Sequence, residues 1–384
     1  MNFLLSDMGL HDRFKPLTLT RPVGAMRMGT LTFAERWEHV LGQLVGYDTE
    51  DYLSGKYPGE AQSDTIYLAG NVVATVDLGR AIQELQQGQV LVQDDSVIAY
   101  RNSQSTHNPF TDLEQTTYTE QVTFIEHPWD LFGQNHDVIA SDFELLTQGR
   151  ESQPVDDHVT LINPDQIFIE PGAKLTYCCL NATDGPIYIG RDAIVMEGAT
   201  IRGPLSLGEH ATIKMGAKIY TGTTIGPHCK IGGEVSNSVI MGYSNKGHDG
   251  FLGNSVLGEW CNLGADTNTS NLKNNYAPVR VWSYETQGFA KTGLQFCGLI
   301  MGDHSKSGIN TMFNTGTVVG VSSNIFGSGF PRNFVPSFSW GGASGFTDYR
   351  LEKATEVAKV VMKRRSIDWS AHDEMIFQHL KKQQ

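Results

Sequence analysis

The chain lacks several features that would assign it to common classes of protein. No two of its five cysteines form a C-x-x-C pair, so the sequence indicates neither a zinc ribbon nor a thiol–disulfide motif. No apolar run approaches 18 residues, so we expect no membrane-spanning helix. The opening MNFLLSDMGLHDRFKP places two acidic residues in a short apolar stretch and does not resemble a signal peptide. We therefore expect a cytoplasmic protein whose cysteines are free, buried thiols.

Positive charge is also scarce. The chain has 29 Lys and Arg against 42 Asp and Glu, with a formal net charge of −13, which disfavours nucleic acid as a partner. Hydrophobic residues make up 40% and charged residues 18% of the sequence, a globular composition. A length of 384 residues predicts at least two domains. The 41 glycines exceed average usage and predict a chain that turns often.

A six-residue repeat is the strongest signal in the sequence. Residues 187–234 divide without a gap into the hexads IYIGRD, AIVMEG, ATIRGP, LSLGEH, ATIKMG, AKIYTG, TTIGPH and CKIGGE. The third place is always a branched aliphatic residue: Ile189, Val195, Ile201, Leu207, Ile213, Ile219, Ile225 and Ile231. The first place is mostly small, as in Ala193, Ala199, Ala211, Ala217 and Thr223.

This period predicts a parallel β-helix over about residues 158–335. Six residues form one short strand and a tight turn, and three such sides close a triangular coil. Residues 18 apart then stack at the strand spacing of about 4.8 Å. The aliphatic residue points inward and glycine serves turns that need a positive φ. The left-handed sense of the helix is implied by the resemblance to hexapeptide-repeat proteins.

The repeat continues imperfectly towards the C-terminus. The segment SNKGHD interrupts it after SVIMGY, and a non-repeating excursion covers about 267–293. Such excursions from a solenoid often carry function. Later inward places fall on Ile240, Leu252, Leu257, Leu263, Met301, Phe313, Val319 and Ile325.

The flanking segments have a different pattern. Residues 1–150 alternate short apolar strands (65–75 and 89–101) with helical patterns (31–46 and 128–146), which predicts an α/β domain. Residues 147–158, TQGRESQPVDDH, have the composition of a linker. Residues 336–384 form a helical tail, in which Thr347 or Asp348 would cap a helix with apolar residues at helical spacing. That helix would pack on the β-helix or on a neighbouring subunit.

His248 is the candidate catalytic residue of the β-helix. It lies in the glycine-flanked segment SNKGHDGFLG, and imidazole can remove a proton near pH 7 when an amine attacks a thioester. Asn262 and Asn271 follow shortly afterwards, and their amides could hold the amine or stabilise an oxyanion. The β-helix therefore predicts an acyl-coenzyme A-dependent acyltransferase.

The run NKGHDGFLGNSVLGEWCNLGADTNTSNLKN resembles the acetyltransferase half of the bifunctional glucosamine-1-phosphate acetyltransferase/N-acetylglucosamine-1-phosphate uridylyltransferase family, in its short bacterial variant. The resemblance rests on Lys246–His248, Asn262–Ala265 and Asn268–Asn271. It implies that His248 is the general base and that Asn262 orients an amino sugar phosphate such as glucosamine 1-phosphate. It also implies an acetyl-coenzyme A donor, a site between subunits of a homotrimer, and a role in UDP-N-acetylglucosamine and cell-wall synthesis.

The same resemblance assigns the remaining site residues. Glu234, Lys218, Phe251 and Lys246 would bind the sugar phosphate, and Ala265, Asn271 and Gly302 would line the coenzyme A channel. The family uses an arginine, a second lysine and a tyrosine for the phosphate, where this chain has Lys218, Ser236 and Phe251. Cations that could compensate are Arg202, Lys214, Lys230 and Lys246.

The segment HDRFKPLTLTRPVGAMRMGTLTFAERW resembles the opening of sugar-nucleotide transferases, and implies UTP as a substrate and Mg²⁺ as a cofactor. Arg13, Lys15 and Arg21 would face the phosphates. However, the phosphate loop is reduced to SDMGL with Gly9 alone, and Asn71 stands where the family has a metal-binding aspartate. An inactive, regulatory domain is as consistent with the sequence as an active one.

Three alternatives remain open. The acceptor could be a nucleotide-linked amino sugar, or the protein could be a non-catalytic sensor of a sugar phosphate or nucleotide. His210 and His228 stand 18 residues apart and should stack on adjacent coils. With His248 or His304 as a third ligand they could hold zinc, as in hexapeptide-repeat carbonic anhydrases.

Overall fold

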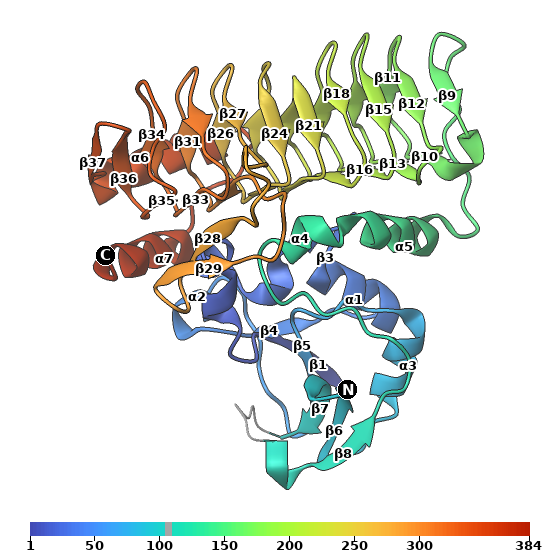
Figure 1. Cartoon of the computed structure of the whole chain (residues 1–384). Coiled ribbons are helices and arrows are strands. Elements are labelled where there is room, and N and C mark those ends of the chain that lie inside the picture. The colour runs from blue at the N-terminus through green and yellow to red at the C-terminus, as the bar shows by residue number, and fades with distance from the viewer. Residues whose placement is uncertain (104–109) are drawn as a thin grey trace.

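The computed structural model describes residues 1–103 and 110–384. A long β-helix forms one layer, the N-terminal domain lies against one side of it, and the C-terminal helices cover its far end (Figure 1). Within the described residues, no helix is both long enough and apolar enough to cross a bilayer.

The N-terminal domain is built around one mixed sheet. Its strand order is β4 (Gly46–Asp48), β1 (Asn2–Ser6), β5 (Thr65–Ala69), β7 (Ser96–Asn102), β6 (Gln89–Gln93) and β8 (Glu114–Thr117). The hairpin β2 (Arg27–Met28)–β3 (Leu31–Thr32) and the helices α1 (Phe33–Leu41), α2 (Asp51–Ser54), α3 (Val76–Gln83), α4 (Asp130–Gly133) and α5 (Asn135–Thr147) complete the domain. Helix α1 begins where Thr32 and Glu35 form a capping box. The predicted α/β class is confirmed.

Three parallel sheets make the sides of the β-helix. The covered sheet faces the N-terminal domain and contains β10 (Ile167–Ile169), β13 (Ile187–Ile189), β16 (Leu205–Leu207), β19 (Thr223–Ile225), β22 (Val239–Ile240), β25 (Val256–Leu257), β30 (Ile300–Met301), β33 (Val318–Val319) and β35 (Phe334–Val335). The lateral sheet contains β11 (Lys174–Leu175), β14 (Ile194–Val195), β17 (Thr212–Ile213), β20 (Lys230–Ile231), β23 (Asn245–Lys246), β26 (Asn262–Leu263), β31 (Lys306–Ser307), β34 (Asn324–Ile325), β36 (Ser339–Gly342) and the antiparallel β37 (Gly345–Asp348). The open sheet contains β9 (Thr160–Ile162), β12 (Cys179–Asn181), β15 (Thr200–Arg202), β18 (Lys218–Ile219), β21 (Glu234–Ser236) and β24 (Phe251–Gly253), and two further strands, β27 (Asn268–Thr269) and β32 (Met312–Phe313), pair beyond it.

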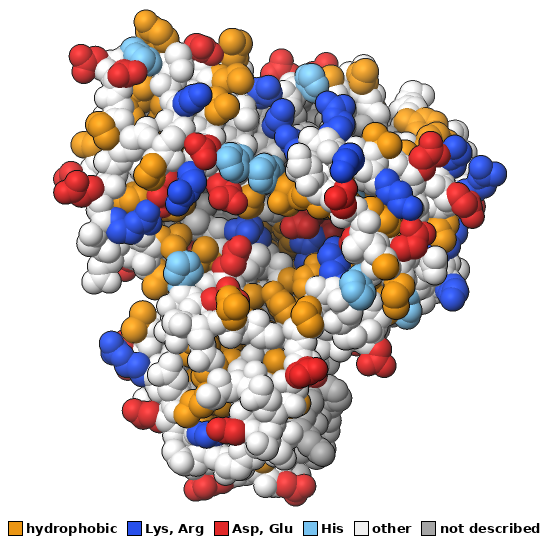
Figure 2. All heavy atoms as spheres, turned by 180° about the vertical axis from the view of Figure 1, so that it is seen from behind, with side chains coloured by type: hydrophobic (Ala, Val, Ile, Leu, Met, Phe, Trp, Pro, Cys, Tyr) orange, Lys and Arg blue, Asp and Glu red, His pale blue; other side chains and the backbone are white. Residues whose placement is uncertain are grey.

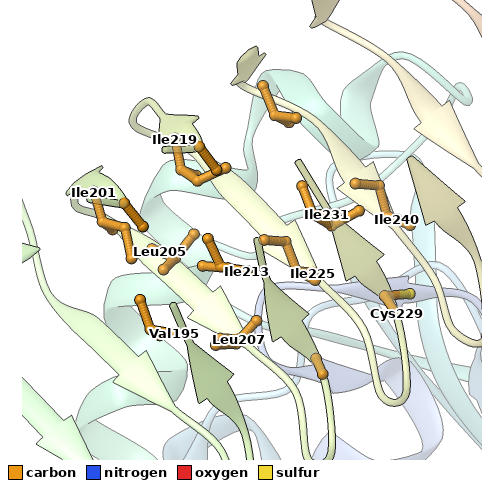
Figure 3. Packing of buried hydrophobic residues seen from close by; sticks show 14 of the residues in the cluster. Val195, Ile201, Leu205, Leu207, Ile213, Ile219, Ile225, Cys229, Ile231 and Ile240 are labelled. Atoms are coloured by element: carbon orange, nitrogen blue, oxygen red, sulfur yellow. The ribbon is translucent and has the colours of Figure 1, made fainter. Parts of the chain in front are cut away.

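The interior of the β-helix is the predicted aliphatic column. The eight third-place residues are at most 3% exposed and belong to one hydrophobic cluster. Figure 3 shows Val195, Ile201, Ile213 and their neighbours pointing towards one another from successive coils. The later inward places, from Ile240 to Ile325, belong to the same cluster. The hexapeptide-repeat fold class is therefore confirmed.

The N-terminal domain covers one sheet through α5 and the loops of residues 14–29. Asn135 in α5 donates from Nδ2 to Thr224 Oγ1 at 3.0 Å, and Thr224 Oγ1 donates to the Gly29 carbonyl at 2.7 Å. Val239, Val256 and Ile300 of the covered sheet join a hydrophobic cluster with residues of the N-terminal domain. The N-terminal domain therefore covers the middle strands of this sheet.

The predicted excursion begins slightly later than expected. Asn268 and Thr269 still pair with Met312 and Phe313 as part of a coil, and only then does the chain leave the solenoid. It forms the hairpin β28 (Arg280–Ser283)–β29 (Gly288–Lys291), which packs against the N-terminal domain. The excursion therefore helps to join the two domains.

The C-terminal tail forms two helices rather than the one predicted. Helix α6 (Leu351–Lys363) begins after Arg350, and its N-terminus has no side-chain cap. The predicted caps were wrong, because Thr347 and Asp348 pair in the hairpin of β36 and β37. Helix α7 (Ala371–Lys382) starts at a capping box of Ser370 and Asp373, and both helices pack on the corner between the covered and lateral sheets.

Candidate functional site

His248 lies at the corner between the lateral and open sheets, two residues after β23 and three before β24. Its side chain is exposed, and its ring forms no hydrogen bond to the part of the chain that the structure describes. The flanking glycines let the backbone bulge here, since Gly250 has a φ of +109°. The imidazole is therefore accessible to a substrate on either adjoining sheet.

Lys246, which we predicted to bind the sugar phosphate, takes an inward place in its coil. It pairs in register with Ile231, and its side chain is only 2% exposed. Its Nζ donates to the carbonyl oxygens of His248 at 2.6 Å and Asp249 at 3.2 Å. Burial lowers the pKa of Lys246 to about 8, although Asp249 and Asp266 oppose that shift. The prediction that Lys246 binds substrate is wrong, and SNKGHD continues the coil with a lysine inside it.

The open sheet brings three predicted substrate residues together. Lys218 pairs in register with Glu234, and Glu234 with Phe251, on consecutive coils. At the usual strand spacing, Lys218 and Phe251 lie about 10 Å apart on the same surface. Neither Lys218 nor Glu234 forms an ion pair with a described residue, so both charges remain free for a ligand.

Phe251 and Asn271 meet at the next corner. A Cβ atom at Gly253 would lie 2.5 Å from the Phe251 ring and 2.7 Å from the Asn271 amide nitrogen. The absence of a side chain at Gly253 therefore leaves room for both side chains over the strand. Asn271 Nδ2 donates to Asn254 Oδ1 at 2.8 Å, which fixes the amide. Asn254 was missed by the sequence analysis, although its 17-residue spacing from Asn271 marks adjacent coils.

Asn262 lies on another side of the same chain. It belongs to the lateral sheet, between Asn245 and Lys306 in register, and its side chain is exposed. Ala265 lies at the same corner as His248, one coil further on, where its carbonyl accepts the Asn310 N–H. The predicted residues thus divide between two sheets that meet at the His248 corner.

A line of glycines follows that corner along the lateral sheet. Gly232, Gly247, Gly264 and Gly308 occupy equivalent places in successive coils. A Cβ at Gly264 would lie 2.5 Å from the Gly308 carbonyl carbon and oxygen, so the spacing of the coils requires glycine. The result is an edge of bare backbone beside His248.

Gly302 does not line this edge. It lies at the end of the covered sheet, where a Cβ would approach Pro16 of the N-terminal domain to 3.2 Å. The residue is buried between the domains, and the prediction that Gly302 lines a coenzyme A channel is wrong.

Arg21 fastens the two domains instead of facing a nucleotide. Its guanidinium is 3% exposed, pairs with Asp303 and lies 3.3 Å from Glu259. Burial alone would lower the pKa of Arg21, but the two carboxylates raise it above its ordinary value. Asp303 also accepts from Thr20 Oγ1 at 2.7 Å. This arrangement contradicts the predicted role of Arg21 in phosphate binding.

Arg13 and Lys15 border a cavity of 160 Å³ between the N-terminal domain and the β28–β29 hairpin. Arg13 Nη2 lies 3.4 Å from Glu285 of that hairpin, and Lys15 Nζ lies 2.6 Å from Asp12. Both cations are therefore already paired, and the excursion covers the surface that they were predicted to present.

The end of β1 does not fit a magnesium–nucleotide site. Asp7 accepts hydrogen bonds from the Val23 N–H at 2.7 Å and from Thr49 Oγ1 at 2.6 Å, and contacts His11 Nδ1 at 3.2 Å. Asn71 donates to the Ile125 carbonyl at 2.9 Å. Across residues 1–103 and 110–384, no three His, Cys, Asp or Glu side chains are placed to hold a metal ion.

The histidines of the zinc alternative belong to an aromatic ladder. His210 and His228 stack at 4.9 Å as predicted, but the following rungs are Tyr243 and Trp260, and His304 comes only after them. His248 lies at the other corner of the lateral sheet. No third histidine reaches the first two within the described ranges.

Comparison with known proteins shows similarity to a sugar nucleotidyl transferase family model and to GlmU proteins. Residues 3–151 match the family model described as sugar nucleotidyl transferase. The bifunctional protein GlmU of Methanocaldococcus jannaschii is 32% identical over 148 residues, which is 38% of this chain and 29% of that relative. GlmU of Methanococcus aeolicus is 37% identical over 92 residues, 24% of this chain and 22% of that relative. Segments of this chain are therefore similar to parts of GlmU proteins.

Other similarities are more partial. The putative uncharacterized acetyltransferase YaiX of Escherichia coli is 34% identical to this chain over 148 residues, 38% of this chain and 64% of that one. Among solved structures, the polySia-specific acetyltransferase NeuO is 13% identical, with a TM-score of 0.29 over 60% of this chain and 100% of that one. The Arabidopsis UDP-N-acetylglucosamine acyltransferase is 15% identical, with a TM-score of 0.23 over 60% of this chain and 90% of that one. The matched segments span less than a third of the GlmU proteins.

Proposed function

We propose that the protein is an acetyl-coenzyme A-dependent N-acetyltransferase whose acceptor is an amino sugar phosphate, with glucosamine 1-phosphate as the first candidate. One observation carries this proposal. An accessible imidazole, His248, lies at a corner whose adjoining open sheet presents a free cation and a free carboxylate in register, Lys218 and Glu234. The relationship to the GlmU proteins agrees with this chemistry.

Each group has a distinct role in the proposed reaction. Lys218 attracts the sugar phosphate, Glu234 accepts hydrogen bonds from sugar hydroxyls, and Phe251 packs against the ring. The imidazole of His248 takes the proton as the amine attacks the thioester carbonyl carbon and forms the C–N bond. The C–S bond then breaks, and coenzyme A leaves as a thiolate that takes this proton back from His248. The glycine edge from Gly247 to Gly308 offers backbone groups along which an extended pantetheine arm can lie.

The site is proposed to be completed by a neighbouring copy. Asn262 is on the lateral sheet, whereas Lys218 and Glu234 are on the open sheet, so one chain cannot direct all three at one ligand. Packing the open sheet of one subunit near the lateral sheet of the next unites them, as in a homotrimer. The exposed apolar side chains of Met215 and Ile309, 69% and 71% exposed, lie at the corner between these sheets.

The test is coenzyme A release from acetyl-coenzyme A in the presence of glucosamine 1-phosphate. The variant His248→Ala should lose at least about 100-fold in kcat, the range expected for a general base. His136→Ala is the matched control, because His136 is also exposed but lies on α5. Full activity in His248→Ala would refute the proposed base.

A nucleotide-linked amino sugar is the second candidate acceptor. A groove of 330 Å³ continues the open sheet beyond Lys218 and is lined by Arg202 and Tyr220, among others. An acceptor with a second phosphate and a base would fill it, whereas a sugar monophosphate would leave it empty. Turnover with UDP-glucosamine but not with glucosamine 1-phosphate would favour this second candidate.

For the N-terminal domain we propose a structural role without nucleotidyl transfer. Asp7, Asn71 and Arg21 are engaged within the protein, and their arrangement does not fit Mg²⁺. Release of pyrophosphate from UTP and N-acetylglucosamine 1-phosphate, dependent on Mg²⁺, would refute this part of the proposal.

A further inference from the structure

Four cations converge where the end of α6 meets the lateral sheet. Lys214 follows β17, Lys230 begins β20, and Arg364 and Arg365 directly follow α6. We call these four residues the basic cluster. They come from three separate parts of the sequence, so the docking of α6 on the β-helix brings them together.

Arg365 anchors the basic cluster to the coils. Its Nη2 donates to the His228 carbonyl at 3.2 Å and approaches Asn245 Oδ1 at 3.5 Å. These contacts hold the guanidinium against two successive coils. The cluster is therefore built by tertiary packing and is not a freely moving tail.

No carboxylate neutralises the basic cluster among the residues that the structure describes. The pKa of Lys230 is lowered by burial and then by Arg365, Lys214 and Arg364, and no acidic group opposes that shift. Other lysines of α6 differ, because Lys359 and Lys363 pair with Glu374 and Asp368 at 3.3 and 2.8 Å. In a chain of net charge −13, four uncompensated cations in one place are unusual.

Helix electrostatics explains only half of the basic cluster. Cations at the last turn of a helix are stabilised by its dipole, which accounts for Arg364 and Arg365. It does not account for Lys214 and Lys230, which belong to the β-helix and raise the local repulsion. Figure 2 shows Lys and Arg side chains gathered over this face of the β-helix.

We propose that the basic cluster is a binding site for an organic phosphate that carries two or more negative charges. Guanidinium groups bind phosphate oxygens in pairs, and lysines add point charges around them. The site is separate from Lys218 and Glu234, which lie on the open sheet. It adjoins the glycine edge, since a Cβ at Gly232 would lie 3.3 Å from the Lys214 Cβ. A long phosphorylated ligand could therefore reach from the basic cluster towards His248, a geometry that rests on the proposed function.

Calorimetric titration of the full chain with inorganic pyrophosphate tests the site. The double variant Lys230→Gln/Arg364→Gln should weaken binding at least about tenfold and flatten its dependence on salt. The matched control Lys359→Gln/Lys363→Gln also removes two positive charges, both from α6 and outside the basic cluster, and should bind as the wild type. Equal binding by both variants, or binding to anionic vesicles without binding to pyrophosphate, would overturn the proposal.

Two further ligands identify the source of the phosphate. If Lys230→Gln/Arg364→Gln weakens the binding of coenzyme A and weakens that of dephospho-coenzyme A less, the basic cluster binds the acetyl donor. If the acceptor loses affinity instead, the cluster receives the acceptor, and no loss with either ligand overturns the assignment to this protein's substrates. His248→Ala should keep its affinity for pyrophosphate, so failure of the acetyltransferase proposal would leave this result intact.

Discussion

The buried ammonium of Lys246 offers the sharpest test of how the His248 corner is built. Methionine at this position keeps a long unbranched side chain inside the coil but removes the charge and both donated hydrogen bonds. We predict that Lys246→Met folds with nearly wild-type stability at pH 7 and loses most of its acetyltransferase activity.

The expected stability follows from two opposing effects. A pKa lowered from 10.5 to about 8 corresponds to at most about 3 kcal/mol against the charged folded state, or about 2 kcal/mol after allowance for solvent screening. Methionine removes that penalty. It also leaves the His248 carbonyl without its donor, at a cost of about 1–3 kcal/mol, whereas the Asp249 carbonyl keeps the Asp266 N–H at 3.1 Å. The net change in unfolding free energy should therefore stay within about 1 kcal/mol.

The pH dependence of the unfolding free energy shows whether Lys246 is a buried charge that opposes folding or whether the site merely accommodates methionine. Folded Lys246 loses its proton near pH 8 and unfolded Lys246 near 10.5, so between those values the unfolded chain binds more protons and stability rises with pH. The gain from Lys246 between pH 7 and 9.5 should be about 1–2 kcal/mol. Burial also lowers the pKa of Lys306 to about 8, so the wild type retains a second source of this slope. Urea unfolding of wild type and Lys246→Met at both pH values isolates the Lys246 contribution.

The activity measurement completes the test. Without the ammonium, the bulge that carries His248 loses its internal anchor, and a misplacement of about 1 Å reduces turnover by about 100-fold. Ile189→Val is the matched interior control, because it also changes the core but lies far from the corner, and its kcat per folded molecule should not change. A Lys246→Met variant with full kcat, or with an unchanged pH slope of stability, would show that this reasoning is wrong.

Three further predictions concern contacts between the two domains, between successive coils and between subunits. In thermal melts, Arg21→Met should lower the unfolding free energy by about 3–5 kcal/mol, since Asp303 stays buried without its cation. The control Arg80→Ala breaks an exposed pair with Asp77 and should change the unfolding free energy by less than about 1 kcal/mol. Gly264→Ala should lower the unfolding free energy by about 1–3 kcal/mol, because its Cβ would meet the backbone of Gly308. The control Gly133→Ala has open space around it and should be neutral or stabilising. An unchanged stability of Gly264→Ala would contradict the close approach of the two coils. Ile309→Glu should dissociate the proposed trimer, as measured by light scattering, and should abolish turnover in the thiol-release assay. The control Met375→Glu on α7 should do neither. An active Ile309→Glu monomer would rule out a site shared between subunits.

The interior of the β-helix could be predicted because its cause is local. A branched aliphatic residue every six positions leaves one consistent way to face the axis of a triangular coil. Each inward residue from Ile189 to Ile231 follows from that spacing alone. The stacking of His210 on His228 follows from the same 18-residue coil.

The errors have causes that lie far apart in the chain. Lys246 was assigned to the sugar phosphate through its motif. Lysine is rarely buried, and the carbonyls that accept its hydrogen bonds exist only once the bulge of His248 and Asp249 has formed. Gly302 was assigned to a binding edge because a repeat does not show which of its three sides another domain covers. Arg21 was assigned to a nucleotide because its partner Asp303 is 282 residues away.

Arg21 also links the two domains in a way that limits what each can do. Its guanidinium is shared by Asp303 and Glu259 of the β-helix, and the Arg21 and Asp303 side chains are buried. To turn towards a nucleotide, it would have to leave a buried carboxylate unpaired, at a cost of about 3–5 kcal/mol. A nucleotide bound through Arg21 would therefore loosen the covered sheet beside the His248 coils. The contact that holds the β-helix against the N-terminal domain is thus the same contact that keeps Arg21 from facing a nucleotide.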